Sequence, residues 1–179
     1  NNIYRSSDLY GVPFRDEVHD NFRNYRDTIL LVDKGEKQVI STLGHDLMND
    51  HPYAETRFRQ AHDNLDKLKK IFRSGDLSAF IKVVESEALT LHAMMMTSQP
   101  YFLLMKPNTL AIINKVFRFR EETGLHLCFT LDAGANVHLL FPEKEAQETL
   151  EFIESELKQY CQNGQYINDR VGSGAKKLA

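Results

Sequence analysis

The stretch TLDAGANVHLL, residues 130–140, places a carboxylate where it could do chemistry. Asp132 ends a run of strand-forming residues, and three small residues follow it before Asn136. Small side chains let a ligand approach the backbone closely, and a carboxylate at such a point can orient or accept the proton of a substrate hydroxyl. A second interpretation stays open, in which Asp132 only closes a tight turn and Gly134 supplies a positive φ.

A second candidate site is VISTLG, residues 39–44. Ser41 and Thr42 end a β-rich run just before Gly44, where hydroxyl and backbone N–H groups could bind a phosphate. The same residues could instead form a turn with satisfied hydroxyls. The histidines within residues 44–51 do not match a zinc-binding spacing, so no metal site is predicted. The sequence contains no P-loop or other glycine-rich phosphate cradle.

Three other reactive side chains are predicted to be structural. His92 lies near the end of a helical pattern, where a packed or capping histidine is expected. Cys128 and Cys161 lie in apolar, periodic contexts. Two cysteines cannot form a disulfide framework, so we expect buried thiols in a reducing cytosol.

Hydrophobic periodicity predicts the elements that position these groups. Two β-rich runs in residues 27–42 surround a turn signal and predict a hairpin. Further strands are expected at residues 125–132, 137–141 and 166–171. Strict alternation in the first of them predicts that Leu125, Leu127, Phe129 and Leu131 share one face. Helices are expected from Pro52 to Gly75, from an N-cap at Asp76 to Met95, from Pro107 to Gly124, and from Ala146 to Asn163. This order predicts an α+β fold, a mostly antiparallel sheet covered by helices on one side.

The composition is that of a single globular domain. The chain has 179 residues, of which 42% are hydrophobic and 26% charged. The net charge of −3 gives no electrostatic reason to expect a nucleic acid or an anionic membrane as partner. No apolar run is long enough for a transmembrane helix, and no signal peptide pattern is found. The missing initiator Met indicates a fragment or a processed product.

Taken together, these stretches resemble the C-terminal half of the mevalonate diphosphate decarboxylases, a family of the GHMP kinase superfamily. The family strand ending in DAGPN reads FTLDAGAN here, residues 129–136, and its VSSTxG hairpin is matched by residues 39–44. Its (D/E)Sxx(F/L)HA helix end is matched more loosely by ESEALTLHA, residues 85–93. Ala135 replaces the usual Pro, and Ile40 replaces the first serine of the hairpin.

The resemblance implies a GHMP kinase C-terminal, ferredoxin-like domain at residues 27–179, with residues 1–26 connecting it to a missing N-terminal half. In that family ATP phosphorylates the tertiary 3-hydroxyl of mevalonate 5-diphosphate. Phosphate then leaves together with CO2, and isopentenyl diphosphate is formed. A small phosphorylated mevalonate would therefore be the partner of this chain.

Residue roles also come from the resemblance. Asp132 would orient or receive the hydroxyl proton. Substrate or phosphate contacts would come from Ser41 and Thr42, and the site wall from Ala133, Gly134 and Asn136. ATP and Mg²⁺ would be bound mainly by the missing half, so the isolated chain would be inactive. The full-length protein would be a cytoplasmic homodimer.

Two other functions remain open at this stage. A related GHMP kinase could phosphorylate a mevalonate-like alcohol without decarboxylating it. The chain could also be a non-catalytic α+β assembly module in which Asp132 is only a turn residue. The sequence leaves open whether the substrate carries one phosphate or two.

Overall fold

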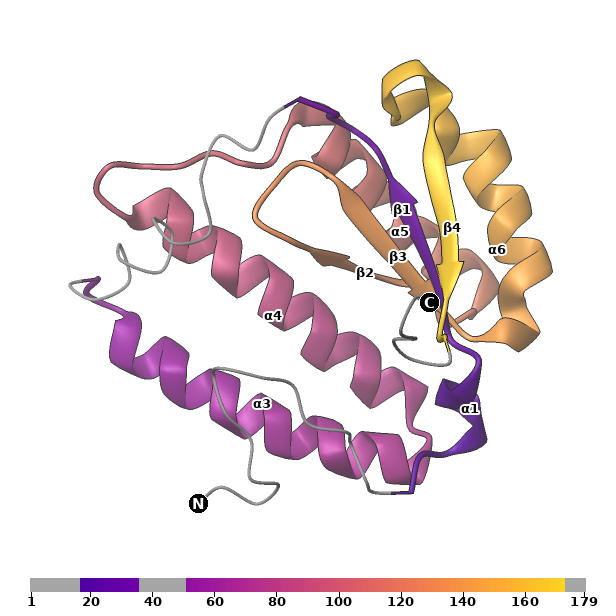
Figure 1. Cartoon of the computed structure of the whole chain (residues 1–179), viewed down its shortest axis with the longest axis horizontal. Helices are drawn as coiled ribbons and strands as arrows, with labels where there is room; N and C mark the ends of the chain where they lie inside the picture. The colour runs from indigo at the N-terminus through magenta and orange to yellow at the C-terminus, as the bar shows by residue number, and fades with distance from the viewer. Residues whose placement is uncertain (1–16, 36–50, 173–179) are drawn as a thin grey trace, which may run out of the picture.

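The computed structural model describes residues 17–35 and 51–172, and its centre is one antiparallel sheet (Figure 1). The strand order is β2-β3-β1-β4, and every neighbouring pair is antiparallel. The strands are β1 (Arg26–Leu30), β2 (Cys128–Leu131), β3 (Val137–Phe141) and β4 (Tyr166–Arg170). The predicted antiparallel α+β fold is confirmed. The second arm of the predicted hairpin lies outside the described residues.

The helices begin and end close to the predicted positions. Asp76 caps its helix as predicted, because its side chain accepts the backbone N–H of Ala79 at 2.9 Å. Gly75 and Gly124 end the preceding and following helices in the left-handed conformation that glycine adopts without strain. The helices are α1 (Asp20–Arg23), α3 (Ala54–Ser74), α4 (Leu77–Thr97), α5 (Pro107–Thr123) and α6 (Ala146–Phe152).

The last predicted helix is confirmed in position but is not uniform. A short 3₁₀ turn (Glu143–Glu145) precedes α6, a π-helical turn (Ile153–Leu157) follows it, and two further 3₁₀ turns complete the segment (Lys158–Tyr160, Gln162–Gly164). The wider π turn coincides with Ile153 and Leu157, both fully buried against the sheet. Both ends of the π turn thus contribute a side chain to the core.

The main core lies between the sheet and helices α5 and α6. The alternation predicted for β2 is confirmed, since Leu127, Phe129 and Leu131 all enter this core. Strand β3 contributes Val137, Leu139 and Phe141 in the same way, each with no exposed surface. Residues of α5 and of the π turn complete the cluster. Helices α5 and α6 thus cover one face of the sheet. The prediction placed helices on one side only, whereas residues of α3 and α4 also pack against the other face at Cys128.

A second core cluster covers one end of the opposite face. Cys128, on the other side of β2, packs with Phe22 and Tyr25 near α1 and with residues of α3 and α4 such as Ile71 and Phe80. The sequence interpretation treated residues 1–26 as a connection without core residues. That is wrong for Phe22 and Tyr25, which are buried where four aromatic rings pack together at tilted and edge-to-face angles.

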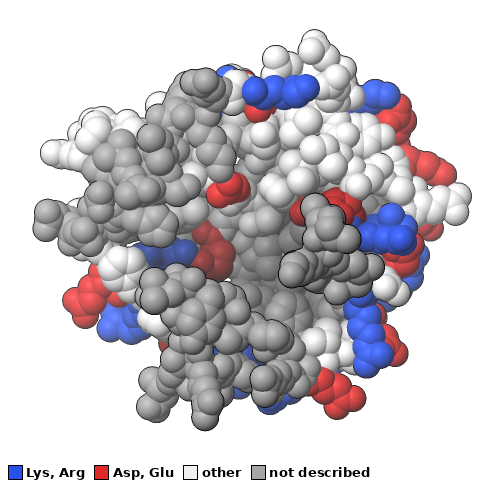
Figure 2. Space-filling model, in the orientation of Figure 1, with Lys and Arg blue, Asp and Glu red and all other residues white. Residues whose placement is uncertain are grey.

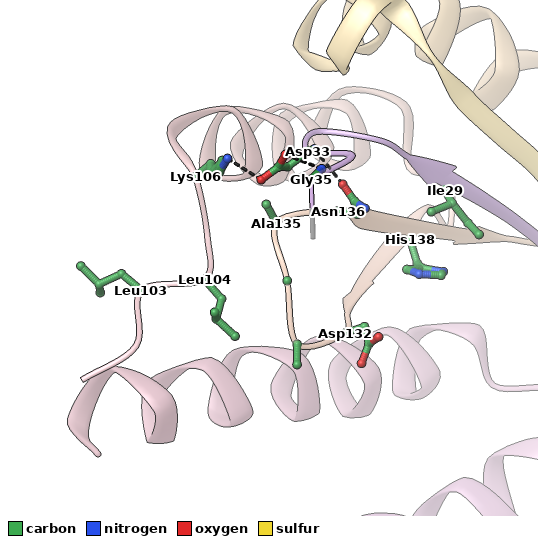
Figure 3. Close-up of a pocket in the computed structure, with 12 residues that line it drawn as sticks. Ile29, Asp33, Gly35, Leu103, Leu104, Lys106, Asp132, Ala135, Asn136 and His138 are labelled. Carbon is green, nitrogen blue, oxygen red and sulfur yellow. Dashed lines mark hydrogen bonds and ion pairs between the residues drawn. The ribbon is translucent and has the colours of Figure 1, made fainter. Parts of the chain in front are cut away.

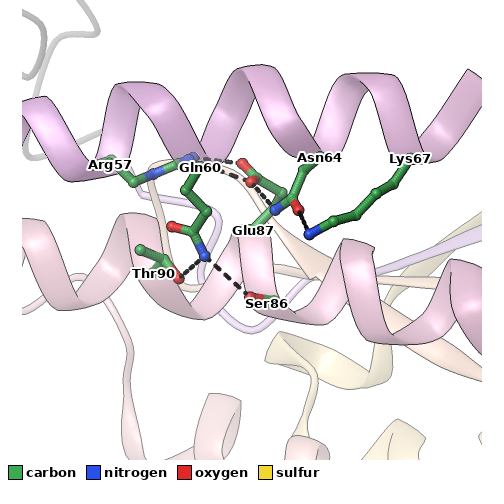
Figure 4. Close-up of polar contacts among 7 residues, drawn as sticks. All are labelled: Arg57, Gln60, Asn64, Lys67, Ser86, Glu87 and Thr90. Atoms are coloured by element: carbon green, nitrogen blue, oxygen red, sulfur yellow. Dashed lines mark hydrogen bonds and ion pairs between the residues drawn. The ribbon is translucent and has the colours of Figure 1, made fainter.

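Helix α3 packs on α4 through polar side chains (Figure 4). Buried Asn64 donates to the Glu87 carboxylate at 2.6 Å, and Arg57 forms an ion pair with the same carboxylate. As a consequence, Phe58 and Leu65 of the apolar α3 pattern are 52% and 54% exposed. The hydrophobic pattern locates this helix but does not identify its buried face.

Surface features of the described chain agree with the composition. Acidic and basic side chains are interspersed over the visible described surface, with no broad field of one sign (Figure 2). Among the described helices, none is long and apolar enough to cross a membrane. Cys128 and Cys161 are buried free thiols, as predicted.

Candidate active site

A pocket of about 170 Å³ lies where three connections meet (Figure 3). Its walls come from the β2–β3 connection, from the segment after β1, and from the segment between α4 and α5. The wall residues with polar side chains are Asp33, Lys106, Asp132, Asn136 and His138. The remaining wall residues are apolar or glycine, among them Leu103 and Leu104, so several polar side chains converge on a small hollow that is partly apolar.

Asp132 is held in place through its backbone. Its carbonyl oxygen accepts the N–H of Gly134 at 2.7 Å and lies 3.1 Å from Nε2 of His92 on α4. Because a carbonyl can only accept, His92 carries a proton on Nε2. Burial lowers the pKa of His92, so this contact is made by a neutral imidazole. His92 is therefore a packed, hydrogen-bonded histidine, as predicted, while the Asp132 side chain remains exposed at the pocket.

The small residues after Asp132 leave open space. A Cβ atom added to Gly134 would meet no heavy atom of the described residues within 4 Å, apart from its chain neighbours. The turn interpretation required a positive φ at Gly134. Gly134 is not among the glycines with positive φ, so that part of the interpretation is wrong. The buried hydroxyl of Thr109 on α5 donates to the carbonyl of Ala135 at 2.7 Å. The loop is thus fixed from α4 and α5, and Gly134 has open space beside it without adopting a positive φ.

The opposite wall carries an ion pair that the sequence did not predict. Lys106, just before α5, pairs with Asp33, just after β1. The Lys106 ammonium, helped by the N–H of Gly35, lowers the pKa of Asp33 below its usual value. The backbone N–H of Asp33 also donates to Oδ1 of Asn136 at 2.9 Å. Asn136 therefore joins the segment after β1 to the β2–β3 connection.

His138 on β3 is the remaining polar wall residue missed by the sequence interpretation. Its Nδ1 lies 3.0 and 3.2 Å from the two carboxylate oxygens of Asp27 on β1. Strand β3 pairs with β1 on one side and with β2 on the other, so this contact depends on the strand order. The sequence held one signal, a histidine between the inward-facing Val137 and Leu139, two positions after Asn136.

The structure brings together four of the predicted site residues, Asp132, Ala133, Gly134 and Asn136. Ser41 and Thr42 lie outside the described residues. Gly35, the last described residue before them, is part of the pocket wall. Within residues 17–35 and 51–172 there is no group of three or more His, Cys, Asp or Glu side chains that could hold a metal ion.

Comparison with known proteins identifies one family. Residues 28–177 match the family model described as the mevalonate 5-diphosphate decarboxylase C-terminal domain. The phosphomevalonate decarboxylase of Haloferax volcanii is 26% identical over 99 residues, which are 55% of this chain and 31% of that protein. This relative is named for a substrate with one phosphate, whereas the family model is named for a diphosphate.

Solved structures with the same fold belong to this group of enzymes. A mevalonate diphosphate decarboxylase from Legionella pneumophila is 26% identical with a TM-score of 0.73, covering 82% of this chain and 45% of its own. A structure described as MDDEF in complex with MVAPP, AMPPCP and magnesium is 21% identical with a TM-score of 0.70, covering 83% and 44%. The chain thus spans about half the length of these solved relatives and about a third of the curated one.

Proposed function

Because the chain belongs to the family of mevalonate 5-diphosphate decarboxylase C-terminal domains, we propose that it supplies the C-terminal half of an ATP-dependent decarboxylase. The substrate is a mevalonate phosphorylated at the 5-position, and the product is isopentenyl diphosphate or isopentenyl phosphate. The observation that supports this proposal is the position of Asp132, whose side chain reaches the pocket while its backbone is held by His92.

The proposed role of Asp132 follows from the chemistry of the substrate. A tertiary hydroxyl is a weak nucleophile at neutral pH, so its attack on a phosphoryl group needs an acceptor within hydrogen-bond reach. Asp132 orients the hydroxyl and takes its proton as the new O–P bond forms and the bond between the terminal phosphoryl group and ADP breaks. Loss of CO2 then leaves an electron pair on carbon, which forms the double bond as the C–O bond breaks and phosphate departs. Positioned proton removal contributes about 10²–10⁴-fold to such reactions.

The neighbours of Asp132 are proposed to shape the space for the substrate. Ala133 and Gly134 present little side-chain bulk, and Asn136 holds the loop to the segment after β1. We propose that Ser41 and Thr42 contact a phosphate of the substrate or nucleotide, which the match to the family hairpin supports.

ATP supplies the phosphoryl group, and we propose that ATP and Mg²⁺ are bound mainly by the other half of the full-length enzyme. On the pocket wall, the charged side chains of Asp33 and Lys106 are paired with each other, so neither needs a ligand to balance its charge. MVAPP, AMPPCP and magnesium occur together in one solved relative, and AMPPCP is an analogue of ATP. We further propose that residues 1–26 lead from that other half, that the isolated chain is inactive, and that the full-length protein is a cytoplasmic homodimer.

The test is an assay of the full-length protein with ATP and either mevalonate 5-phosphate or mevalonate 5-diphosphate. We expect CO2 release with one of the two, in step with formation of ADP. A stable 3-phosphorylated product without CO2 would instead identify a kinase. Absence of ADP formation with both substrates would support the assembly-module alternative and contradict the proposal.

A further inference from the structure

His138 and Asp132 share one side of the sheet and one pocket. On β3, His138 lies opposite Thr130 of β2 and opposite Ile29 of β1. Since Asp132 follows Thr130 by two positions, both side chains lie on the face away from the main core. Figure 3 shows Asp132 and His138 on the wall of the same pocket. A ligand that reaches the Asp132 carboxylate therefore also comes close to the imidazole.

Asp27 fixes the orientation of the imidazole. Both oxygens of its carboxylate lie within 3.2 Å of Nδ1 of His138. An ionised carboxylate only accepts hydrogen bonds, so Nδ1 carries a proton in either charge state of the ring. The other ring nitrogen, Nε2, has no hydrogen-bond partner in the described part of the chain. Nε2 therefore accepts a hydrogen bond when the ring is neutral and donates one when it is protonated.

The surrounding charges favour the protonated ring. The hydrogen bond to Asp27 raises the pKa of His138 above its ordinary value, and the charges of Asp27 and Asp132 add to this effect against burial. The other charged residues of the pocket wall, Asp33 and Lys106, are paired with each other. The His138 side chain is 27% exposed, so a ligand can reach it.

We propose that protonated His138 donates a hydrogen bond from Nε2 to an anionic oxygen of the substrate, next to the hydroxyl that Asp132 orients. This inference rests on the proposed function. A 3-hydroxy acid phosphorylated at its hydroxyl has two such groups near that oxygen, its carboxylate and the new phosphoryl group. Asp27 acts as the positioning residue, because it holds the proton on Nδ1 and the ring in place.

Two variants of the full-length protein test the charge requirement. His138→Gln removes the titrating donor, and His138→Lys keeps a positive charge over the whole range from pH 6.5 to 9. A hydrogen bond to a charged group corresponds to about a tenfold to hundredfold change in affinity. We expect His138→Gln to bind the substrate more weakly by that factor at pH 6.5. The affinity of the wild-type protein should fall toward the His138→Gln value as the pH rises.

In His138→Lys the affinity for the substrate should not fall in this way as the pH rises. The substrate phosphate itself titrates with a pKa near 6, and this effect is the same in both proteins, so it cancels when the wild-type protein is compared with His138→Lys. The matched control is His126→Gln. His126 also contacts a carboxylate, that of Glu145 at 2.9 Å, but it does not line the pocket. Wild-type affinity in His138→Gln over the whole pH range would overturn the inference, as would a pH dependence in His138→Lys equal to that of the wild-type protein.

A measurement on the wild-type protein does not depend on the folding of any variant. Titration of His138 by NMR should give a higher pKa with bound substrate than without. Mevalonate carries the carboxylate without any phosphate, so a raised pKa with mevalonate identifies the carboxylate as the group contacted. Isopentenyl phosphate carries only the distal phosphate and serves as the control in which no shift is expected. An unchanged pKa with mevalonate and with the phosphorylated mevalonates would contradict the inference. If CO2 is released normally in that case, the proposed function stands and only the role of His138 is lost.

Discussion

Replacing Thr109 by Val tests whether α5 anchors the loop that carries Asp132. Thr109 has no exposed surface. Its hydroxyl donates to the carbonyl of Ala135 at 2.7 Å and accepts the N–H of Lys106 at 3.1 Å. Valine has nearly the same shape but makes neither hydrogen bond. The substitution therefore removes both contacts while it leaves the packing of α5 almost unchanged.

The magnitude follows from the two groups left without a partner. A buried carbonyl without a hydrogen bond costs about 1–3 kcal/mol, and the loss of a second, more accessible bond costs about 0.5–1.5 kcal/mol. The free energy of unfolding of Thr109→Val should thus fall by about 2–4 kcal/mol. With a urea dependence of about 2 kcal/mol per molar, the midpoint of urea unfolding should fall by about 1–2 M.

The matched control is Thr149→Val in α6. Thr149 is also fully buried, but its hydroxyl has no hydrogen-bond partner among the residues that the structure describes. Exchanging an unsatisfied hydroxyl for a methyl group should leave the stability unchanged or raise it. Urea unfolding followed by circular dichroism measures both variants. Equal losses of stability in Thr109→Val and Thr149→Val would refute the assignment of the Thr109 hydrogen bonds as the anchor.

Three further predictions concern other side chains of the same fold. Glu85→Ala removes the bidentate partner of Arg120 at 2.7 and 3.1 Å, while the partly exposed guanidinium keeps its hydrogen bond to the Leu127 carbonyl. The free energy of unfolding should fall by about 1–3 kcal/mol, and a loss below about 0.5 kcal/mol in urea unfolding would contradict this. Asp27→Asn should lower the pKa of His138. Because the pKa of His138 is raised in the folded protein, protonation of His138 stabilises the fold fully below about pH 6.5, and this stabilisation is lost as the pH rises through the folded pKa. The variant should therefore lose stability mainly at low pH. NMR titration and unfolding from pH 5 to 9 measure both effects, and an unchanged pKa of His138 would contradict the prediction. Cys128 is fully buried and burial raises its pKa, so it should react with a thiol reagent only on unfolding; rapid reaction in the native protein would disagree.

The strand that carries Asp132 could be predicted because its information is local. Strict alternation identified the inward face of β2, and the change to small residues marked where the strand ends. The caps at Asp76, Gly75 and Gly124 are also local signals, since each depends on one residue type at one backbone position. These features needed no knowledge of the strand order.

The pairs that complete the pocket could not be predicted, because they join distant parts of the chain. Asp27 meets His138 only through the register of β1 on β3, and Lys106 meets Asp33 only where two connections converge. The buried face of α3 could not be predicted either, because it also depends on contacts with a distant part of the chain. Asn64 is buried because Glu87 on α4 and Lys67 on α3 satisfy its side chain, so polarity there does not indicate exposure.

The most direct test of the account is the turnover of Asp132→Asn in the full-length protein, measured as CO2 release with ATP and the phosphorylated mevalonate that the wild-type protein uses. Asparagine keeps the size of the side chain but cannot take the hydroxyl proton. A suitable control is Asp63→Asn, because Asp63 is exposed on α3 and does not line the pocket. The account predicts a native fold in both variants, wild-type turnover in Asp63→Asn, and a loss of about 10²-fold or more in Asp132→Asn. Unchanged turnover in Asp132→Asn would contradict the central claim.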